Sequence, residues 1–141
     1  GSFDNRLHAI DGSTGQVKWS YRTNDDVISS PAVARDGKTV YIPSTSGVVH
    51  AVSDKGEKRW STDLGHPVMA EPVLDGDGTL YVGNDDGKVY AIDGKKGKIL
   101  WSHAVWESRH RADALRERHR VDGVGRLNFD FRTGRTTSAT R

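Results

Sequence analysis

The chain has 141 residues, a normal length for one domain, and a formal net charge of +2. It contains no cysteine, which excludes disulfides, thiolate metal sites and cysteine nucleophiles. Hydrophobic residues make up only 34% of it and glycines number 16, so short strands joined by turns are expected; no apolar run reaches the roughly 18 residues of a membrane span.

Residues 1–26 predict two strands, the second half of a four-stranded unit. Their central phrase, "LHAIDGSTGQVKW", returns as "VHAVSDKGEKRW" at 49–60 and as "VYAIDGKKGKILW" at 89–101. The tryptophans of the three copies, Trp19, Trp60 and Trp101, are spaced 41 residues apart. This regular spacing indicates an internal structural repeat.

Residues 27–65 contain one full period of the repeat. Four strands are predicted there: "VISSPAVA" (27–34), "TVYIP" (39–43), "VVHAVS" (48–53) and "EKRWST" (57–62). Residues 66–105 follow the same plan with "VMAEPVL", "TLYVG", "KVYAID" and "KILWS". Four antiparallel strands in a period of about 40 residues predict an all-β fold made of β-propeller blades.

The predicted organisation is therefore a partial blade at 1–26 and complete blades at 27–65 and 66–105. Propellers close with at least about four blades, and a single blade cannot bury both faces of its sheet. We expect the chain to be a fragment of a larger ring, completed by the missing blades of a parent propeller or by self-association.

Residues 106–141 differ abruptly from the rest. They hold nine arginines, no lysine and five acidic residues, whereas residues 1–105 hold 12 basic and 14 acidic residues. The repeat loses its register there and returns only as a degenerate partial blade at 123–135. Three interpretations of 106–124 stay open: a helical insertion, an arginine-rich arm for a polyanion, and a shifted reading frame in the coding DNA.

The repeated phrase contains the pattern A-x-D-x-x-T-G-x-x-x-W, with departures in two of its copies. Lys96 replaces threonine in the third copy, and the second copy carries Ser53 for aspartate and is one residue shorter. The pattern resembles the tryptophan-docking motif of the quinoprotein-like (pyrroloquinoline-quinone-type) propeller repeat family. The resemblance implies blade-docking roles for Ala9, Asp11, Thr14, Gly15, Trp19, Ala51, Gly56, Trp60, Ala91, Asp93, Gly97 and Trp101.

That family includes quinone-dependent dehydrogenases, outer-membrane assembly lipoproteins and sensor ectodomains. Blades without long insertions favour a non-catalytic scaffold for protein or ligand binding, closest in style to the assembly lipoproteins. The alternative is a fragment of a quinone-dependent alcohol or sugar dehydrogenase. The resemblance also implies a periplasmic or other extracytoplasmic location in a bacterium and a protein partner in the cell envelope.

The sequence supports no cofactor, and it offers one candidate site residue. Quinone-dependent members use an adjacent cysteine pair and calcium-binding acids, so pyrroloquinoline quinone and calcium are expected only under the dehydrogenase alternative. "DGDG" at 75–78 reads as a hairpin turn, and the position shared by His8, His50 and Tyr90 as a packing position. Glu71, on the innermost predicted strand, is a candidate channel contact. The slightly acidic body argues against nucleic acid.

Overall fold

The computed structural model describes residues 1–105, 127–130 and 135–138 of the chain. The chain divides into two compact units, Gly1–Trp106 and Glu107–Arg141. Every regular element among the described residues is a β-strand, which confirms the predicted all-β class. The same residues contain no helix long and apolar enough to cross a membrane.

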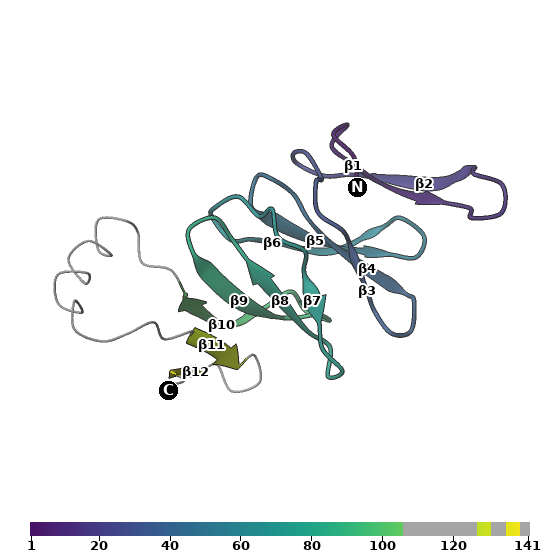
Figure 1. Cartoon of the computed structure of the whole chain (residues 1–141). Coiled ribbons are helices and arrows are strands. Elements are labelled where there is room, and N and C mark those ends of the chain that lie inside the picture. The colour runs from purple at the N-terminus through teal and green to yellow at the C-terminus, as the bar shows by residue number, and fades with distance from the viewer. Residues whose placement is uncertain (106–126, 131–134, 139–141) are drawn as a thin grey trace. The chain divides into compact units, whose positions relative to one another are not determined.

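The first unit holds one hairpin and two four-stranded antiparallel sheets (Figure 1). The hairpin pairs β1 (Arg6–Ile10) with β2 (Val17–Arg22). The next sheet consists of β3 (Ala32–Val33), β4 (Thr39–Pro43), β5 (Val48–Ser53) and β6 (Lys58–Asp63). The last consists of β7 (Val73–Leu74), β8 (Thr79–Gly83), β9 (Lys88–Asp93) and β10 (Ile99–Ala104). Neighbours in each sheet are neighbours in the chain, so each four-stranded sheet is a simple meander.

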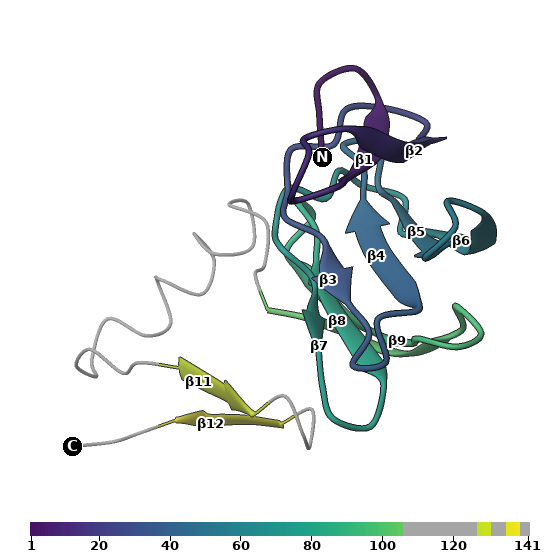
Figure 2. The same ribbon diagram turned by 90° about the vertical axis from the view of Figure 1, so that its right-hand side faces the viewer.

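The innermost strands are shorter than the sequence predicted. Strands were expected over 27–34 and 68–74, but only two residues of each segment pair, as β3 and β7. Pairing begins directly after Pro31 and Pro72, because proline has no N–H to donate to a neighbouring strand. The two short strands lie beside each other, as Figure 2 also shows, so the sheets meet along their innermost edges.

The second unit is described only in part. Its strands β11 (Leu127–Asp130) and β12 (Arg135–Ser138) form an antiparallel hairpin. The second strand extends beyond 135, where the degenerate partial blade was predicted to end. All three interpretations of 106–124 concern residues outside the described part of the chain.

The middle sheet is buried on both faces. Successive residues of a strand point to opposite sides, so β4 and β5 each contribute to two cores. Tyr41 and Ala51 belong to the core shared with sheet β7–β10, whereas Ile42 and Val52 belong to the core shared with the β1–β2 hairpin. This double burial explains why these strands read as nearly continuous apolar runs.

His50 lies in the core between the β1–β2 hairpin and the middle sheet. Its side chain is 2% exposed, its Nδ1 lies 3.1 Å from the Tyr21 hydroxyl, and the two rings meet edge to face. Its Nε2 is buried without a hydrogen-bond partner among the described residues. Tyr90 fills the equivalent position on β9, and its hydroxyl donates to the Leu64 carbonyl at 3.4 Å. The shared histidine-or-tyrosine position therefore packs one sheet against the preceding one.

We expect His50 to make the stability of the chain depend on pH. Burial, with a smaller contribution from the positive charge of Lys58, lowers the pKa of His50 from 6.5 to about 4. Between these values the unfolded chain binds a proton that the folded chain refuses, so the free energy of unfolding should fall as the pH falls from 6.5 toward 4. Above this window the group contributes no pH dependence.

The variant His50→Tyr, which copies Tyr90, should flatten this part of the profile measured by urea unfolding at several pH values. The control Val52→Ala removes buried methyl groups from the same core without changing a titratable group, so it should lower the stability and leave the slope unchanged. Equal slopes for the unmodified chain and His50→Tyr would contradict the assignment.

Candidate functional site

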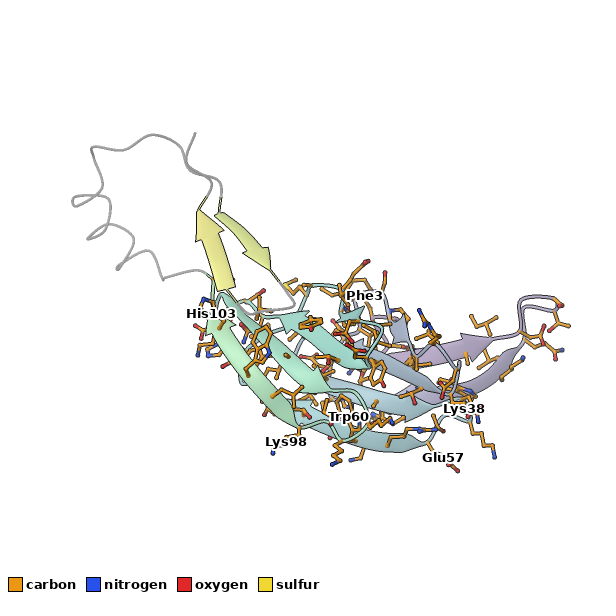
Figure 3. The ribbon with its side chains drawn as sticks, turned by 90° about the horizontal axis from the view of Figure 1, so that it is seen from below. Phe3, Lys38, Glu57, Trp60, Lys98 and His103 are labelled. Atoms are coloured by element: carbon orange, nitrogen blue, oxygen red, sulfur yellow. The ribbon has the colours of Figure 1, made fainter. Side chains whose placement is uncertain are left out.

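Two of the three predicted docking tryptophans, Trp19 and Trp60, lie at the contacts between successive sheets. The Trp60 indole N–H donates to the carbonyl of Gly94, at the end of β9 in the next sheet, at 2.9 Å. The Trp19 indole N–H makes the equivalent bond to the Asp54 carbonyl, also at 2.9 Å. Figure 3 shows Trp60 where the two four-stranded sheets come together. Each tryptophan thus joins its own sheet to the turn of the following one.

The alanine of the motif lies between two aromatic residues. Ala51 pairs with Tyr41 on one side and with Trp60 on the other; we call these three residues the first aromatic row. Because the alanine side chain is small, the two rings meet above it with centroids 5.8 Å apart. The second aromatic row, Tyr81, Ala91 and Trp101, repeats the arrangement on β8–β10 at 6.0 Å. Ala9 pairs with Trp19 in the hairpin.

The aspartate of the motif closes its own turn. Asp11 Oδ1 accepts the N–H groups of Ser13 and Thr14 at 2.8 and 3.2 Å, and Asp93 Oδ1 does the same for the two residues that follow Gly94. These backbone hydrogen bonds lower the pKa of both carboxyl groups. In the shorter second copy the Ser53 hydroxyl accepts two backbone N–H groups instead. A hydroxyl therefore replaces the carboxylate without loss of the turn.

The glycines of the second and third copies of the motif face the tryptophan of the preceding copy. A Cβ added to Gly97 would lie 2.6 Å from the Trp60 ring, and one added to Gly56 would lie 2.9 Å from the Trp19 ring. Gly15 has the same left-handed backbone but no atom within 4 Å of such a Cβ. Its neighbour Thr14 accepts the Gln16 N–H through its hydroxyl at 3.3 Å.

Glu71 lies in the exposed segment just before β7 rather than within an inner strand. The Ser30 hydroxyl, on the segment before β3, donates to its carboxylate. The pair links the two sheets at their innermost edge. That Glu71 lines a channel stays a prediction.

The acids of the "DGDG" turn hold the turn itself. Asp75 Oδ1 accepts the N–H groups of Asp77 and Thr79, and Oδ2 accepts the Tyr81 hydroxyl at 3.0 Å. Partial burial raises the pKa of Asp75, but these hydrogen bonds outweigh it and hold the pKa below its usual value. Within the described ranges no three or more histidine, aspartate or glutamate side chains gather as metal ligands would. The quinone and calcium of the dehydrogenase alternative stay a prediction of that alternative.

A cleft of about 560 Å³ lies between the two four-stranded sheets. Its walls are the β3–β4 turn and the β7–β8 turn, and Tyr41 and Gly94 also line it. Arg59 of β6 and Lys95 of the β9–β10 turn lie at its border. The sequence analysis missed this cleft because its residues come from separate segments and carry no motif; the only signal was the charge of the two equivalent turns.

Comparisons with known proteins agree with this geometry. The family model described as outer membrane protein assembly factor BamB matches residues 1–130. BamB of Shewanella oneidensis is 30% identical over an alignment of 108 residues, and the match covers 71% of this chain and 26% of that protein. The crystal structure of BamB from Moraxella catarrhalis has a TM-score of 0.68 at 21% identity and covers 77% of this chain and 32% of its own, which shows the propeller fold.

Two protein kinases contain a similar section. AfsK of Streptomyces griseus is 32% identical over 113 residues, 72% of this chain and 14% of the kinase. The kinase/endoribonuclease ire-1 of Caenorhabditis elegans is 29% identical over 96 residues, 68% of this chain and 10% of that protein. The chain thus spans between 10% and 26% of the length of these three relatives.

We expect Gly97→Ala to destabilise the chain more than Gly15→Ala. Both glycines have positive φ, +71° and +72°, so either alanine costs about 1 kcal/mol in backbone strain. Only at position 97 does the new methyl group also meet a tryptophan ring, which adds about 1–3 kcal/mol to the loss. Urea unfolding of the two variants measures the difference. Gly56→Ala should behave like Gly97→Ala, and equal losses at all three positions would contradict the docking role.

Proposed function

Because the chain belongs to the propeller-repeat family described as outer membrane protein assembly factor BamB, we propose that it is a non-catalytic scaffold that binds protein. The proposal includes an extracytoplasmic location and a protein partner in a bacterial cell envelope, by analogy with the BamB relatives. It assigns no reaction and no cofactor to the chain.

The observation that carries the proposal is that the motif residues make contacts between sheets. Trp60 and Tyr41 both donate hydrogen bonds to the Gly94 carbonyl, and Asp93 closes the turn that presents this carbonyl. The motif residues therefore make the contacts between blades. A partner would bind at the turns and clefts that these contacts bring together. Such an architecture suits a rigid surface for partners better than a reaction centre.

The proposal also includes at least one further blade. A single blade cannot bury both faces of its sheet, so the missing blades of a parent propeller or a second copy of the chain would complete the ring.

The two kinase relatives show that a match to this repeat does not by itself assign an activity. The matched section is a small part of each kinase, so the same repeat occurs in proteins of different overall activity. What such proteins share is the propeller section, and the proposal is accordingly restricted to binding.

We expect this chain to replace its counterpart in a BamB protein. In Shewanella oneidensis BamB, the 108-residue section that aligns with this chain would be exchanged for the matching residues of this chain. In cells lacking BamB, the chimera should restore the amount of folded outer membrane proteins, measured by heat-modifiable gel mobility. The same chimera with Trp60→Ala, which loses the contact to Gly94, is the matched control and should restore less. A stably expressed chimera that restores nothing would contradict the proposal.

The dehydrogenase alternative has its own test. We expect no saturable change in tryptophan fluorescence or melting temperature when pyrroloquinoline quinone and calcium are added to the 141-residue chain. A known quinone-dependent dehydrogenase serves as the positive control. Saturable stabilisation by the quinone would favour the alternative.

A further inference from the structure

We propose that the cleft between the β3–β4 and β7–β8 turns is the docking site for an acidic peptide segment of a protein partner. This inference rests on the protein-binding function proposed above and names the chemistry of the partner. The cleft volume of about 560 Å³ lies within the range of sites that enclose small ligands or a few side chains. Both turns lie at the lower end of the sheets in Figures 1 and 2.

The walls of the cleft are held in place by hydrogen bonds. In the β3–β4 turn, Ala34 N–H donates to Thr39 O at 2.8 Å, and Asp36 Oδ1 accepts the Lys38 N–H at 2.9 Å. The β7–β8 turn is closed by Asp75. At the base, Gly94 N–H donates to Gly78 O at 3.0 Å, which connects that turn to the β9–β10 turn. A preformed site loses little conformational entropy when a partner binds.

Unused hydrogen-bonding capacity in the cleft belongs mainly to cations. Arg35, Arg59 and Lys95 line it, and none of their charged groups pairs with a side chain or carbonyl of the described residues. Of the three acids in the lining, the Asp75 carboxylate is occupied by three donors, Asp36 accepts a backbone N–H, and only the Asp77 carboxylate accepts no hydrogen bond from the described residues. Guanidinium and ammonium groups without a partner are donors suited to carboxylates.

The charges at the base of the cleft support this placement. Burial raises the pKa of Tyr41; the positive charge of Arg59 lowers it, and the negative charges of Asp36 and Asp93 add to the rise. Tyr41 in turn donates its hydroxyl hydrogen to Gly94, next to Lys95. Arg59 and Lys95 therefore flank one part of the cleft from two neighbouring sheets.

The mixture of charges selects a weakly charged peptide over a dense polyanion. Arg35, Arg59 and Lys95 are balanced formally by Asp36, Asp75 and Asp77, and a phosphate backbone would meet all three acids. A short segment with two spaced carboxylates can reach the cations, which come from three different elements. Ala34, Leu74 and the Tyr41 ring give such a segment an apolar surface as well.

The test is an NMR titration of the ¹⁵N-labelled 141-residue chain with the capped peptide Ala-Glu-Leu-Glu-Ala. Saturable shifts of the amide signals of Arg35, Gly78 and Lys95 are expected. The double variant Arg59→Ala/Lys95→Ala should bind about tenfold more weakly, since two solvent-accessible charge pairs are lost. The control Arg6→Ala/Arg22→Ala removes the same charge from the β1–β2 hairpin and should bind like the unmodified chain.

Several outcomes would overturn the assignment. These are equal binding of the neutral peptide Ala-Gln-Leu-Gln-Ala, equal weakening by both double variants, absence of any shift, and shifts confined to residues 107–141. Tighter binding of a DNA oligonucleotide at the same amides would assign the cleft to a polyanion instead. If the acidic peptide fails while the BamB chimera restores assembly, the scaffold function stands and this cleft is not its docking site.

Discussion

Two side chains of the middle sheet bond to one backbone carbonyl of the next sheet. The Gly94 oxygen receives the indole N–H of Trp60 and the hydroxyl of Tyr41, so two large side chains of one sheet end on a single atom of the next. Ala51 leaves space for both rings, and Gly97 carries no side chain that would obstruct the indole. Removing any one of these features leaves either a polar group without its hydrogen bond or an aromatic ring without room to pack.

Burial on both faces follows from that contact. Once each sheet is held against its successor, alternate residues of β4 and β5 enter two different cores, and neither core can form from one sheet alone. The energetic consequence is visible at His50, whose imidazole lies between sheets where a charge is disfavoured. Tyr90 occupies the equivalent position without a disfavoured charge, because its hydroxyl donates a hydrogen bond to the Leu64 carbonyl.

The cleft that we propose as a docking site also results from the stacking of the two sheets. The β3–β4 and β7–β8 turns come from two neighbouring sheets, and the cleft between them is lined by charged residues of both sheets. The β3–β4 and β7–β8 turns differ in charge between the two sheets, whereas the alanine, glycine and tryptophan of the motif recur in all three copies. This separation explains how one repeat can occur in an outer membrane assembly factor and in protein kinases.

The sequence by itself determined the repeat unit. The spacing of 41 residues between tryptophans, the turn glycines and the apolar strands follow local rules of chain geometry, so the strands of the blades and their order could be derived. The shortness of β3 and β7 also follows from a local rule, because Pro31 and Pro72 lack the N–H that strand pairing needs. What only the tertiary structure decided is which groups meet across blades. Trp60 bonds a carbonyl 34 residues away, and Arg59 and Lys95 border one cleft, because these approaches depend on how two sheets stack, which no local pattern specifies.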